Sequence, residues 1–382
     1  MSVKSNYFKM GKEEFNEYLN NLKKENNSIH LLNNNFYYNN CYNSNNMILV
    51  LNNKITEFNF LIESFSQFVK HQIVQSFLIE EIEATNKIEN IYSTRHDIFK
   101  IINDVSSSKD KKIISIANAY KHLLENGGYQ IFSNSNVRNL YDEVLKGSIE
   151  KDDLPDGLYY RINSVYTTNG LNLIHTGVIG EENINKMMEE FIRLYNSNIE
   201  VLTKMILCHV MFEYIHPFYD GNGRLGRFLM SNGLFLENKK YFSLIISLAL
   251  EYEKEKYYKA FKEANDKYEF GFLNTYVETV CSILINQVDI LIKKINLDKE
   301  KLLNYKTNIK MTKSEKKIYS LLSEASIFSN YGVSSIEILK ETNVSKRTLI
   351  YSLNKFREYK ILNETKIGRN SYFKLVENKE LI

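Results

Sequence analysis

The sequence predicts a mainly α-helical protein with one β-hairpin and a small separate domain at its C-terminal end. Apolar residues recur at spacings of three and four over most of residues 57–298, which is the period of an α-helix. The pair Asn169-Gly170 lies between two short β-prone runs, a pattern typical of a hairpin. Charge also divides the chain: residues 301–382 hold 16 Lys or Arg and 8 Asp or Glu (net +8), and the remainder holds 33 and 38 (net −5).

Length and periodicity divide the chain into four segments. At 382 residues it is long enough for two or three domains. We expect an Asn-rich N-terminal segment at 1–56, a helical region at 57–110, a helical core at 111–298 and a basic domain at 299–382. Helices are predicted at 57–90, 111–125, 137–145, 185–195, 199–214, 224–237, 241–250, 253–265, 273–295, 314–328, 335–341 and 346–359.

The first 50 residues have a biased composition. Fourteen of them are Asn, and no helical period is sustained across them. We therefore expect low-complexity sequence there. The short apolar run Met47–Leu51 is predicted to be a strand or an edge of the core.

Composition predicts a soluble globular protein of the cytoplasm. Hydrophobic residues make up 43% and charged residues 25% of the chain, which is usual for that class. We find no basic and apolar leader and no apolar run of about 18 residues, so we expect a cytoplasmic protein that does not bind a membrane. Cys41, Cys208 and Cys281 are odd in number and far apart, which argues against a disulfide framework and against a zinc site.

Residues 215–227 are the most informative stretch, and they read IHPFYDGNGRLGR. Pro217 disfavours the α conformation of the residue before it, so His216 is expected just past the helix that begins near Ile199. That helix is apolar nearly all round, which predicts a buried and rigid element. His216 is therefore expected at the mouth of a loop, on a fixed support.

The turn after His216 is predicted to bind an anion. Gly221, Asn222 and Gly223 allow a tight turn that directs N–H groups outward at the start of a helix, an arrangement that holds phosphate. Arg224 and Arg227 lie three residues apart and project from one side of that helix. Two guanidinium groups beside such N–H groups suit a polyphosphate.

The run HPFYDGNGRLGR resembles the Fic motif HPFx(D/E)GNGRxxR, with every defining position filled. The resemblance implies a Fic helical core that transfers AMP from ATP to a Tyr, Thr or Ser hydroxyl of a protein, with the chain itself as one candidate. It implies that His216 is the catalytic base and that Asp220 holds Mg²⁺. It assigns nucleotide binding to Gly221, Asn222, Gly223, Arg224, Gly226 and Arg227. A Fic fold that transfers phosphocholine, UMP or phosphate is an open alternative.

A second segment resembles the part of Fic proteins that lines the adenine and ribose. Tyr257, Tyr258 and Asn265 match it in type and spacing, within EKYYKAFKEANDK. The resemblance implies that these residues bind the nucleotide. Two aromatic residues at this spacing also suit packing between helices, and that alternative stays open.

A third segment fits the pattern (S/T)xxxE(G/N) through Thr85, Glu89 and Asn90. It resembles the inhibitory helix that precedes the core in one class of Fic proteins. Helical spacing puts Thr85 and Glu89 on one face. The resemblance implies that Glu89 pairs with Arg227 in place of the ATP γ-phosphate and holds the enzyme in a low-activity state. A solvated helix face is the alternative.

The predicted hairpin has strands at 165–168 and 171–176. In position it resembles the Fic flap, which implies that Leu173, Ile174, His175 and Thr176 hold the target segment by strand addition. Fic proteins often carry a Pro-Pro pair after the flap, whereas Val178-Ile179 stands here. For His175 we expect a hydrogen-bonding surface residue rather than a second catalytic group.

The basic C-terminal segment resembles a winged helix-turn-helix. Three predicted helices are followed by strand-like runs at 361–365 and 371–375. Lys346, Arg347 and Lys355 fall on the recognition helix and Arg369 in the wing. Domains of this kind bind DNA or serve as protein interaction and dimerisation modules, so DNA and a homodimer partner are both open alternatives.

Overall fold

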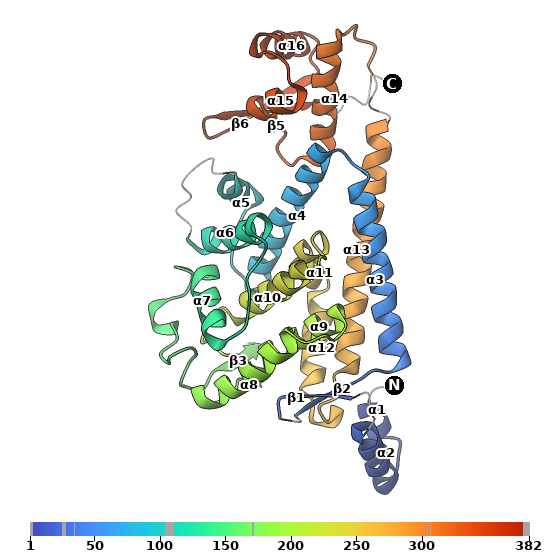
Figure 1. Cartoon of the computed structure of the whole chain (residues 1–382), viewed down its shortest axis with the longest axis vertical. Helices are drawn as coiled ribbons and strands as arrows, with labels where there is room; N and C mark the ends of the chain where they lie inside the picture. Colours follow the sequence, from blue (N-terminus) through green and yellow to red (C-terminus); the bar gives the residue numbers. More distant parts are fainter. Residues whose placement is uncertain are drawn as a thin grey trace. The chain divides into compact units, whose positions relative to one another are not determined.

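The computed structural model describes residues 3–24, 28–33, 35–103, 111–169, 172–303, 305 and 307–376. Within these residues it has sixteen α-helices and three small sheets, which confirms the predicted mainly α fold class (Figure 1). The chain forms two compact units. The first comprises residues 1–56, 81–93 and 110–287, and the second comprises residues 57–80, 94–109 and 288–382. The second unit thus takes residues from three of the predicted segments.

The N-terminal segment of the first unit is folded, although its Asn-rich composition shows no sustained helical period. Its elements are α1 (Val3–Tyr7), α2 (Lys12–Lys24), β1 (Ser28–Leu31), β2 (Phe36–Asn39) and α3 (Tyr42–Glu63). β1 and β2 pair antiparallel. The run Met47–Leu51 lies inside α3 and is not a strand.

A small aromatic cluster explains why this segment folds. Phe15 of α2 is buried together with Val3, Tyr37 and Phe272, and the next apolar positions of α2 pack against them. The apolar residues of α2 are Phe15, Tyr18, Leu19 and Leu22. Their spacing is helical, but polar Asn, Glu and Lys residues between them conceal the period.

Nine longer helices build the core of the first unit around α9. They are the C-terminal part of α4 (Gln67–Ile88), α6 (Lys111–Asn126), α7 (Asn134–Val144), α8 (Glu181–Tyr195), α9 (Val201–Ile215), α10 (Asn222–Leu236), α11 (Ile246–Tyr252), α12 (Lys254–Ala264) and the first part of α13 (Asn274–Leu303). Short 3₁₀ turns are η1 (Lys151–Asp153), η2 (Phe242–Leu244) and η3 (Lys267–Glu269). α9 packs against both α8 and α10, and every residue of 202–212 is buried. This confirms the predicted buried helix before His216.

The predicted hairpin is present as β3 (Tyr166–Asn169) and β4 (Asn172–Thr176), paired antiparallel. The register shifts between Thr167 and Thr168. The predicted turn residue Gly170 lies outside the described residues, as do the side chains of Leu173 and Ile174.

The second unit contains a three-stranded sheet with strand order β5-β7-β6. Its elements are α5 (Arg95–Ile102), α14 (Lys313–Phe328), β5 (Val333–Ser334), α15 (Ser335–Thr342), α16 (Lys346–Glu358), β6 (Leu362–Ile367) and β7 (Asn370–Leu375), together with the end of α3, the start of α4 and the end of α13. Capping boxes start α14 at Thr312 and α15 at Ser334. The sequence missed α5 and β5.

The predicted helix at 57–90 is two helices, because α3 ends at Glu63 and α4 begins at Gln67. Ser66 stands between them, and its Oγ accepts the N–H of Val69 at 3.2 Å. A serine that satisfies a free N–H of the first turn is a typical helix start.

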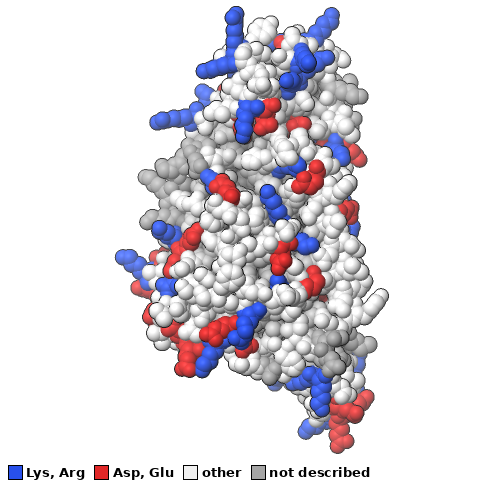
Figure 2. Space-filling model, in the orientation of Figure 1, with Lys and Arg blue, Asp and Glu red and all other residues white. Residues whose placement is uncertain are grey.

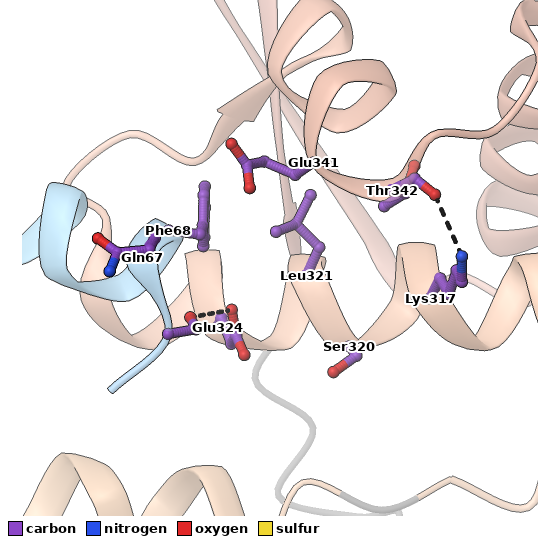
Figure 3. Close-up of a pocket in the computed structure, with 9 residues that line it drawn as sticks. Gln67, Phe68, Lys317, Ser320, Leu321, Glu324, Glu341 and Thr342 are labelled. Atoms are coloured by element: carbon purple, nitrogen blue, oxygen red, sulfur yellow. Dashed lines mark hydrogen bonds between the residues drawn. The ribbon is translucent and has the colours of Figure 1, made fainter. Parts of the chain in front are cut away.

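A polar hollow lies within the second unit (Figure 3). It is lined by Ser66, Gln67, Phe68, Lys317, Ser320, Leu321, Glu324, Glu341 and Thr342. Hydrogen bonds at its wall run from Lys317 Nζ to the Thr342 carbonyl oxygen at 3.5 Å and from Ser66 Oγ to Glu324 at 3.3 Å. None of the predicted site residues lines it.

The surface shows the charge asymmetry that the sequence predicts. In Figure 2, Lys and Arg side chains gather over the part of the surface that Figure 1 assigns to α14, α15 and α16, with few acidic side chains among them. One helix differs from the expectation that no segment is long and apolar enough to cross a membrane. α13 contains a window of 18 residues with a mean hydropathy of 1.3, but 56% of that window is buried, as in core helices of soluble proteins.

Candidate active site

His216 lies where the sequence places it, directly after α9. It is the C-terminal cap of that helix, and its N–H donates to the Phe212 carbonyl oxygen at 2.9 Å. Its backbone has φ 51° and ψ 62°, which is the left-handed region and not the extended region that a following proline usually favours. A histidine in this conformation is strained and must be held by its surroundings.

The imidazole of His216 is half-buried and neutral at pH 7. Burial lowers its pKa to about 4, although the nearby Glu213 carbonyl acts in the opposite direction. Nδ1 lies 3.3 Å from that carbonyl oxygen, which can only accept, so Nδ1 carries the hydrogen. Nε2 is therefore left with its lone pair, as a general base requires.

Arg161 fixes the backbone of His216, and the sequence analysis missed it. Its side chain is fully buried, and Nε donates to the His216 carbonyl oxygen at 2.9 Å. Its other nitrogens donate to the carbonyl oxygens of Val178, at 2.7 Å, and Asn163. Burial lowers the pKa of Arg161 to about 10, so the group remains charged at pH 7. An isolated Arg among aromatic and β-prone residues carries no recognisable pattern.

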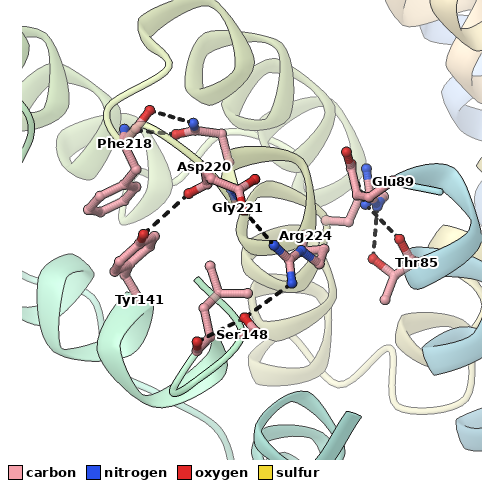
Figure 4. A network of polar contacts seen from close by, with 11 residues as sticks. Thr85, Glu89, Tyr141, Ser148, Phe218, Asp220, Gly221 and Arg224 are labelled. Atoms are coloured by element: carbon pink, nitrogen blue, oxygen red, sulfur yellow. Dashed lines mark hydrogen bonds and ion pairs between the residues drawn. The ribbon is translucent and has the colours of Figure 1, made fainter. Parts of the chain in front are cut away.

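The turn after His216 requires glycine at position 221. Gly221 caps α10 with φ 83°, and an added Cβ would collide with the Leu145 side chain. The Gly221 N–H donates to Asp220 Oδ1 at 2.6 Å (Figure 4). The first N–H groups of α10 have no acceptor within the helix, and they lie where the sequence predicts an anion site.

Asn222, which is expected to bind the nucleotide, also contacts the loop before it. Its Oδ1 accepts the Phe218 N–H at 2.9 Å, and its Nδ2 donates to the Phe218 carbonyl oxygen at 2.7 Å (Figure 4). These two bonds to one residue stabilise the loop between His216 and α10. The second Nδ2 hydrogen and the backbone N–H of Asn222 can still donate to a phosphate.

Arg224 lies beside Asp220 at the start of α10, as predicted. Its guanidinium donates to Ser148 Oγ at 3.2 Å and to Asp220 Oδ2 at 3.3 Å (Figure 4). Its buried Nε has no hydrogen-bond partner among the described residues. A buried, unpartnered cationic donor beside a helix N-terminus fits a phosphate oxygen.

Asp220 is the one predicted metal ligand, and its side chain is half exposed. The described part of the chain holds no group of three or more His, Cys, Asp or Glu residues arranged for a metal. A single carboxylate fits Mg²⁺, which is usually held by one or two carboxylates together with the phosphates of the substrate. The same set does not fit a structural metal held by protein ligands alone.

Arg227 is buried and binds Thr85 of α4 and Glu89, the residue that follows this helix. Its NH2 group donates to Glu89 Oε1 at 2.8 Å, and its Nε donates to Thr85 Oγ1 at 3.0 Å (Figure 4). A further bond joins it to the Thr85 carbonyl oxygen at 3.1 Å. The Glu89 side chain keeps 35% exposure, against 2% for Arg227. The pair is thus open to solvent from the Glu89 side.

The backbone of Asn90 explains why the last position of the pattern (S/T)xxxE(G/N) is Gly or Asn. It adopts φ 56°, which Asn and Gly tolerate better than other residues. Its N–H bonds the Lys87 carbonyl oxygen, and the Ile91 N–H bonds that of Asn86, which is the Schellman arrangement at a helix end. Glu89 is therefore the last residue before the turn and not part of the helix body.

Lys254 and Tyr258 satisfy the end of α4. Lys254 Nζ donates to the Ile88 carbonyl oxygen at 2.8 Å, and the Tyr258 hydroxyl donates to it at 3.4 Å. Tyr258 is exposed to 44%, so a nucleotide could contact its ring. In the present state, however, its hydroxyl supports the segment that carries Glu89.

Three residues expected to contact the nucleotide have structural roles. Tyr257 is buried, and its hydroxyl lies 2.8 Å from His209 Nε2. Asn265 caps α12, where its Nδ2 donates to the Phe261 carbonyl oxygen at 2.8 Å. An added Cβ at Gly226 would lie 2.6 Å from Glu213 Oε1, so this glycine permits the close approach of α9 and α10.

His175 is not the surface residue that the sequence predicted. It is 8% exposed, and its Nε2 donates to the Tyr214 carbonyl oxygen at 2.6 Å. Burial lowers its pKa, so it stays neutral at pH 7. The bond ties strand β4 to the end of α9, which is a structural role.

Glu213 is a second residue that the sequence analysis missed. Burial raises the pKa of its carboxyl to about 7, against the effect of the Arg227 charge. Its Oε1 is buried and has no hydrogen-bond partner among the described residues. Glu213 thus has two properties near His216: its backbone carbonyl oxygen accepts from His216 Nδ1, and its side-chain carboxyl titrates near pH 7.

Comparison with known proteins agrees with this geometry. Residues 131–234 match the Fic/DOC family. A curated protein of Aquifex aeolicus, named "Probable protein adenylyltransferase", is 43% identical over 68 residues, and this match spans 18% of the present chain and 19% of that protein.

Solved structures resemble the chain in fold. A Fic family protein from Desulfovibrio desulfuricans G20 has a TM-score of 0.53 and 18% identity, over 87% of this chain and 97% of that one. Fic-1 from C. elegans has a TM-score of 0.47 and 17% identity, over 65% and 72% of the two chains. Residues 131–234, which hold the run HPFYDGNGRLGR, are therefore similar to the Fic/DOC family.

Proposed function

We propose that the chain transfers AMP from ATP to a hydroxyl group of a protein, which is another protein or the chain itself. The observation that carries the proposal is the neutral imidazole of His216, whose Nε2 is free while its backbone is held at the N-terminal side of α10. The buried Arg224 and Arg227 add positive charge on the same helix. The Aquifex aeolicus relative, named as an adenylyltransferase, points to the same class of reaction.

In the proposed reaction, the oxygen of a protein hydroxyl attacks the α-phosphorus of ATP and pyrophosphate leaves. A hydroxyl group is a weak nucleophile at pH 7, so His216 Nε2 takes its proton as the new P–O bond forms, which typically contributes about 10²- to 10⁴-fold. The N–H groups at the start of α10 and Arg224 stabilise charge on the phosphate oxygens. Mg²⁺, when bound, neutralises charge on the phosphates, and Asp220 is the residue that would hold it.

Glu89 is proposed to keep this site at low activity. Among the described residues, the Arg227 guanidinium donates three hydrogen bonds, two to Thr85 and one to Glu89. A terminal phosphate of ATP would compete with Glu89 for the same cation. Exchanging one anion for the other requires the α4 end to move or the carboxylate to rotate away.

The test uses the intact chain with ATP and Mg²⁺, read by intact mass. The Glu89→Gly variant should gain the mass of one AMP group. If it does not modify itself, it should transfer label from labelled ATP to a protein of an added lysate. Glu89→Gly/His216→Ala should show no gain. If Glu89→Gly binds ATP but transfers nothing to itself or to any added protein, the proposed activity is wrong.

The identity of the donor is tested with the same variant. Incubation with ATP, UTP, GTP or CDP-choline separates AMP transfer from transfer of UMP, GMP or phosphocholine by the added mass. Transfer of phosphate from ATP gives its own, smaller mass. If the added mass is not that of AMP, the protein is still a transferase, but the proposal that it transfers AMP from ATP is wrong.

A further inference from the structure

We propose that the outer face of α16 and the β6–β7 hairpin bind double-stranded DNA. This proposal concerns the second unit alone and does not depend on the proposed transfer of AMP. It commits to a nucleic acid and not to a protein partner, because the charge and residue types of this face select between them.

The elements of the second unit have the order of a winged helix-turn-helix. α15 and α16 are separated by three residues, 343–345, and the hairpin of β6 and β7 follows α16. Asn343 adopts φ 51° and ends α15, and Ser345 Oγ accepts the Thr348 N–H at 3.0 Å to start α16. In DNA-binding proteins of this order, the second helix enters the major groove and its N-terminal residues reach the bases.

The two faces of α16 differ in chemistry. The inner face buries Leu349, Ser352, Leu353 and Phe356. The outer face exposes Lys346, Arg347, Ile350, Tyr351 and Asn354. The only acidic residue of the helix is Glu358, at its far end. The first turn thus presents two cations, and the first three turns contain no carboxylate.

Ion pairs show which basic side chains of this region are already bound to a carboxylate and which can bind a phosphate. Lys355, which the sequence placed on the recognition surface, pairs with the buried Glu315 at 3.0 Å, so its role is structural. Arg357 pairs with Glu364 at 2.7 Å. Lys346 and Arg347 form no ion pair with any carboxylate in the part of the chain that the structure describes, and both are exposed.

The hairpin adds a second cationic position. Arg369 lies in the turn between β6 and β7, is exposed, and forms no ion pair within the described residues. An exposed Arg beside the recognition helix can donate to the sugar-phosphate backbone. Phosphate contacts from the wing position the protein, whereas contacts from the helix select the sequence.

The residue types of the outer face favour DNA over a protein partner. Lys and Arg donate to guanine, Asn pairs with adenine, and apolar side chains such as Ile350 can contact the thymine methyl group. Protein interfaces are depleted of Lys but enriched in Tyr and Arg, so it is Lys346 that favours DNA over a protein partner. The cationic surface seen over α14, α15 and α16 in Figure 2 also suits the phosphate backbone.

The experiment uses the full chain and a fluorescent duplex of random sequence, with binding followed by anisotropy at several salt concentrations. We expect binding that weakens linearly on a log–log scale as salt rises. Lys346→Glu/Arg347→Glu should weaken it by at least tenfold. The matched control Lys9→Glu/Lys12→Glu makes the same change in net charge at exposed residues of the first unit and should bind as the parent does.

Thermal unfolding of both double variants, followed by circular dichroism, checks that they fold. Repeated selection of bound duplexes by the parent chain should enrich a sequence, and the enrichment should be lost in Lys346→Glu/Arg347→Glu. Absence of binding at low salt, or an equal loss in both double variants, would overturn the proposal. Loss of self-association in Lys346→Glu/Arg347→Glu with unchanged DNA binding would assign the face to a protein partner instead.

Discussion

Arg161 Nε donates to the carbonyl oxygen of His216 at 2.9 Å, from a guanidinium that is fully buried. The same group donates to Val178, just after strand β4, so one side chain ties the end of α9 to the base of the hairpin. His216 keeps a left-handed backbone at this point. The bond therefore supports the one conformation that the proposed base adopts.

We expect Arg161→Met to lower the free energy of unfolding by about 2–4 kcal/mol, because three carbonyl oxygens lose their donor. AMP transfer in the Glu89→Gly background should fall by about 10²-fold, since a small displacement of a catalytic group has effects of this size. Urea unfolding and the rate of mass gain measure the two effects.

The matched control is Arg193→Met, which removes an exposed Arg from α8 and should change neither quantity. Arg161→Lys keeps the charge but lacks the planar fork, so it should recover stability in part and activity less. If Arg161→Met loses stability but keeps its rate, Arg161 supports the fold without positioning His216.

Asn90 is expected to set the strength of inhibition through its backbone. Asn90→Val places a β-branched residue at φ 56°, which costs about 1–2 kcal/mol and loosens the turn that positions Glu89. We expect basal AMP transfer to rise by about five- to thirtyfold if the whole of that strain weakens the Glu89–Arg227 pair. Asn90→Gly accepts the same backbone and should keep the parent rate. If Asn90→Val and Asn90→Gly transfer AMP at the same rate, the backbone conformation at residue 90 does not control inhibition.

The local parts of the site could be predicted from the sequence. His216, Asp220, Gly221 and Arg224 lie within nine residues, so their spacing fixes their arrangement once the two helices are recognised. The distant pair of Glu89 and Arg227 came from a resemblance, because no physical rule joins residues 138 positions apart. The structure then supplied the contact.

The missed features all depend on partners that are far away in the sequence. Arg161 is a clamp only because it meets the carbonyl oxygen of His216. Lys355 looked available for DNA until α14 brought Glu315 beside it. In the same way, α2 folds because Phe15 meets Phe272. Tertiary burial of this kind overrides the composition of a short segment.

The pH dependence of transfer should reflect the low pKa of His216. Because burial lowers that pKa to about 4, the imidazole is unprotonated throughout the neutral range. We expect the kcat/KM of Glu89→Gly for ATP to be flat from about pH 5.5 to 8 and to fall as the pH drops toward 4, since the protonated ring cannot act as a base. An inflection near the ordinary value of about 6.5 would show that His216 is solvated in the active enzyme.

Glu213 should make the stability of the chain depend on pH in the opposite sense. Its pKa in the fold is about 7, raised from 4.5 by burial, so the folded state holds a proton that the unfolded state releases. The stability from this group is complete below about pH 4.5 and is lost as the pH rises through 7, by about 3 kcal/mol. Glu213→Gln cannot ionise, so its free energy of unfolding should exceed that of the parent at pH 8 and match it at pH 4. Urea denaturation measures both values, with the exposed Glu125→Gln as the control. The opposite outcome is that the parent and Glu213→Gln lose the same stability between these pH values. It would show that the Glu213 carboxylate gains a favourable partner when it ionises.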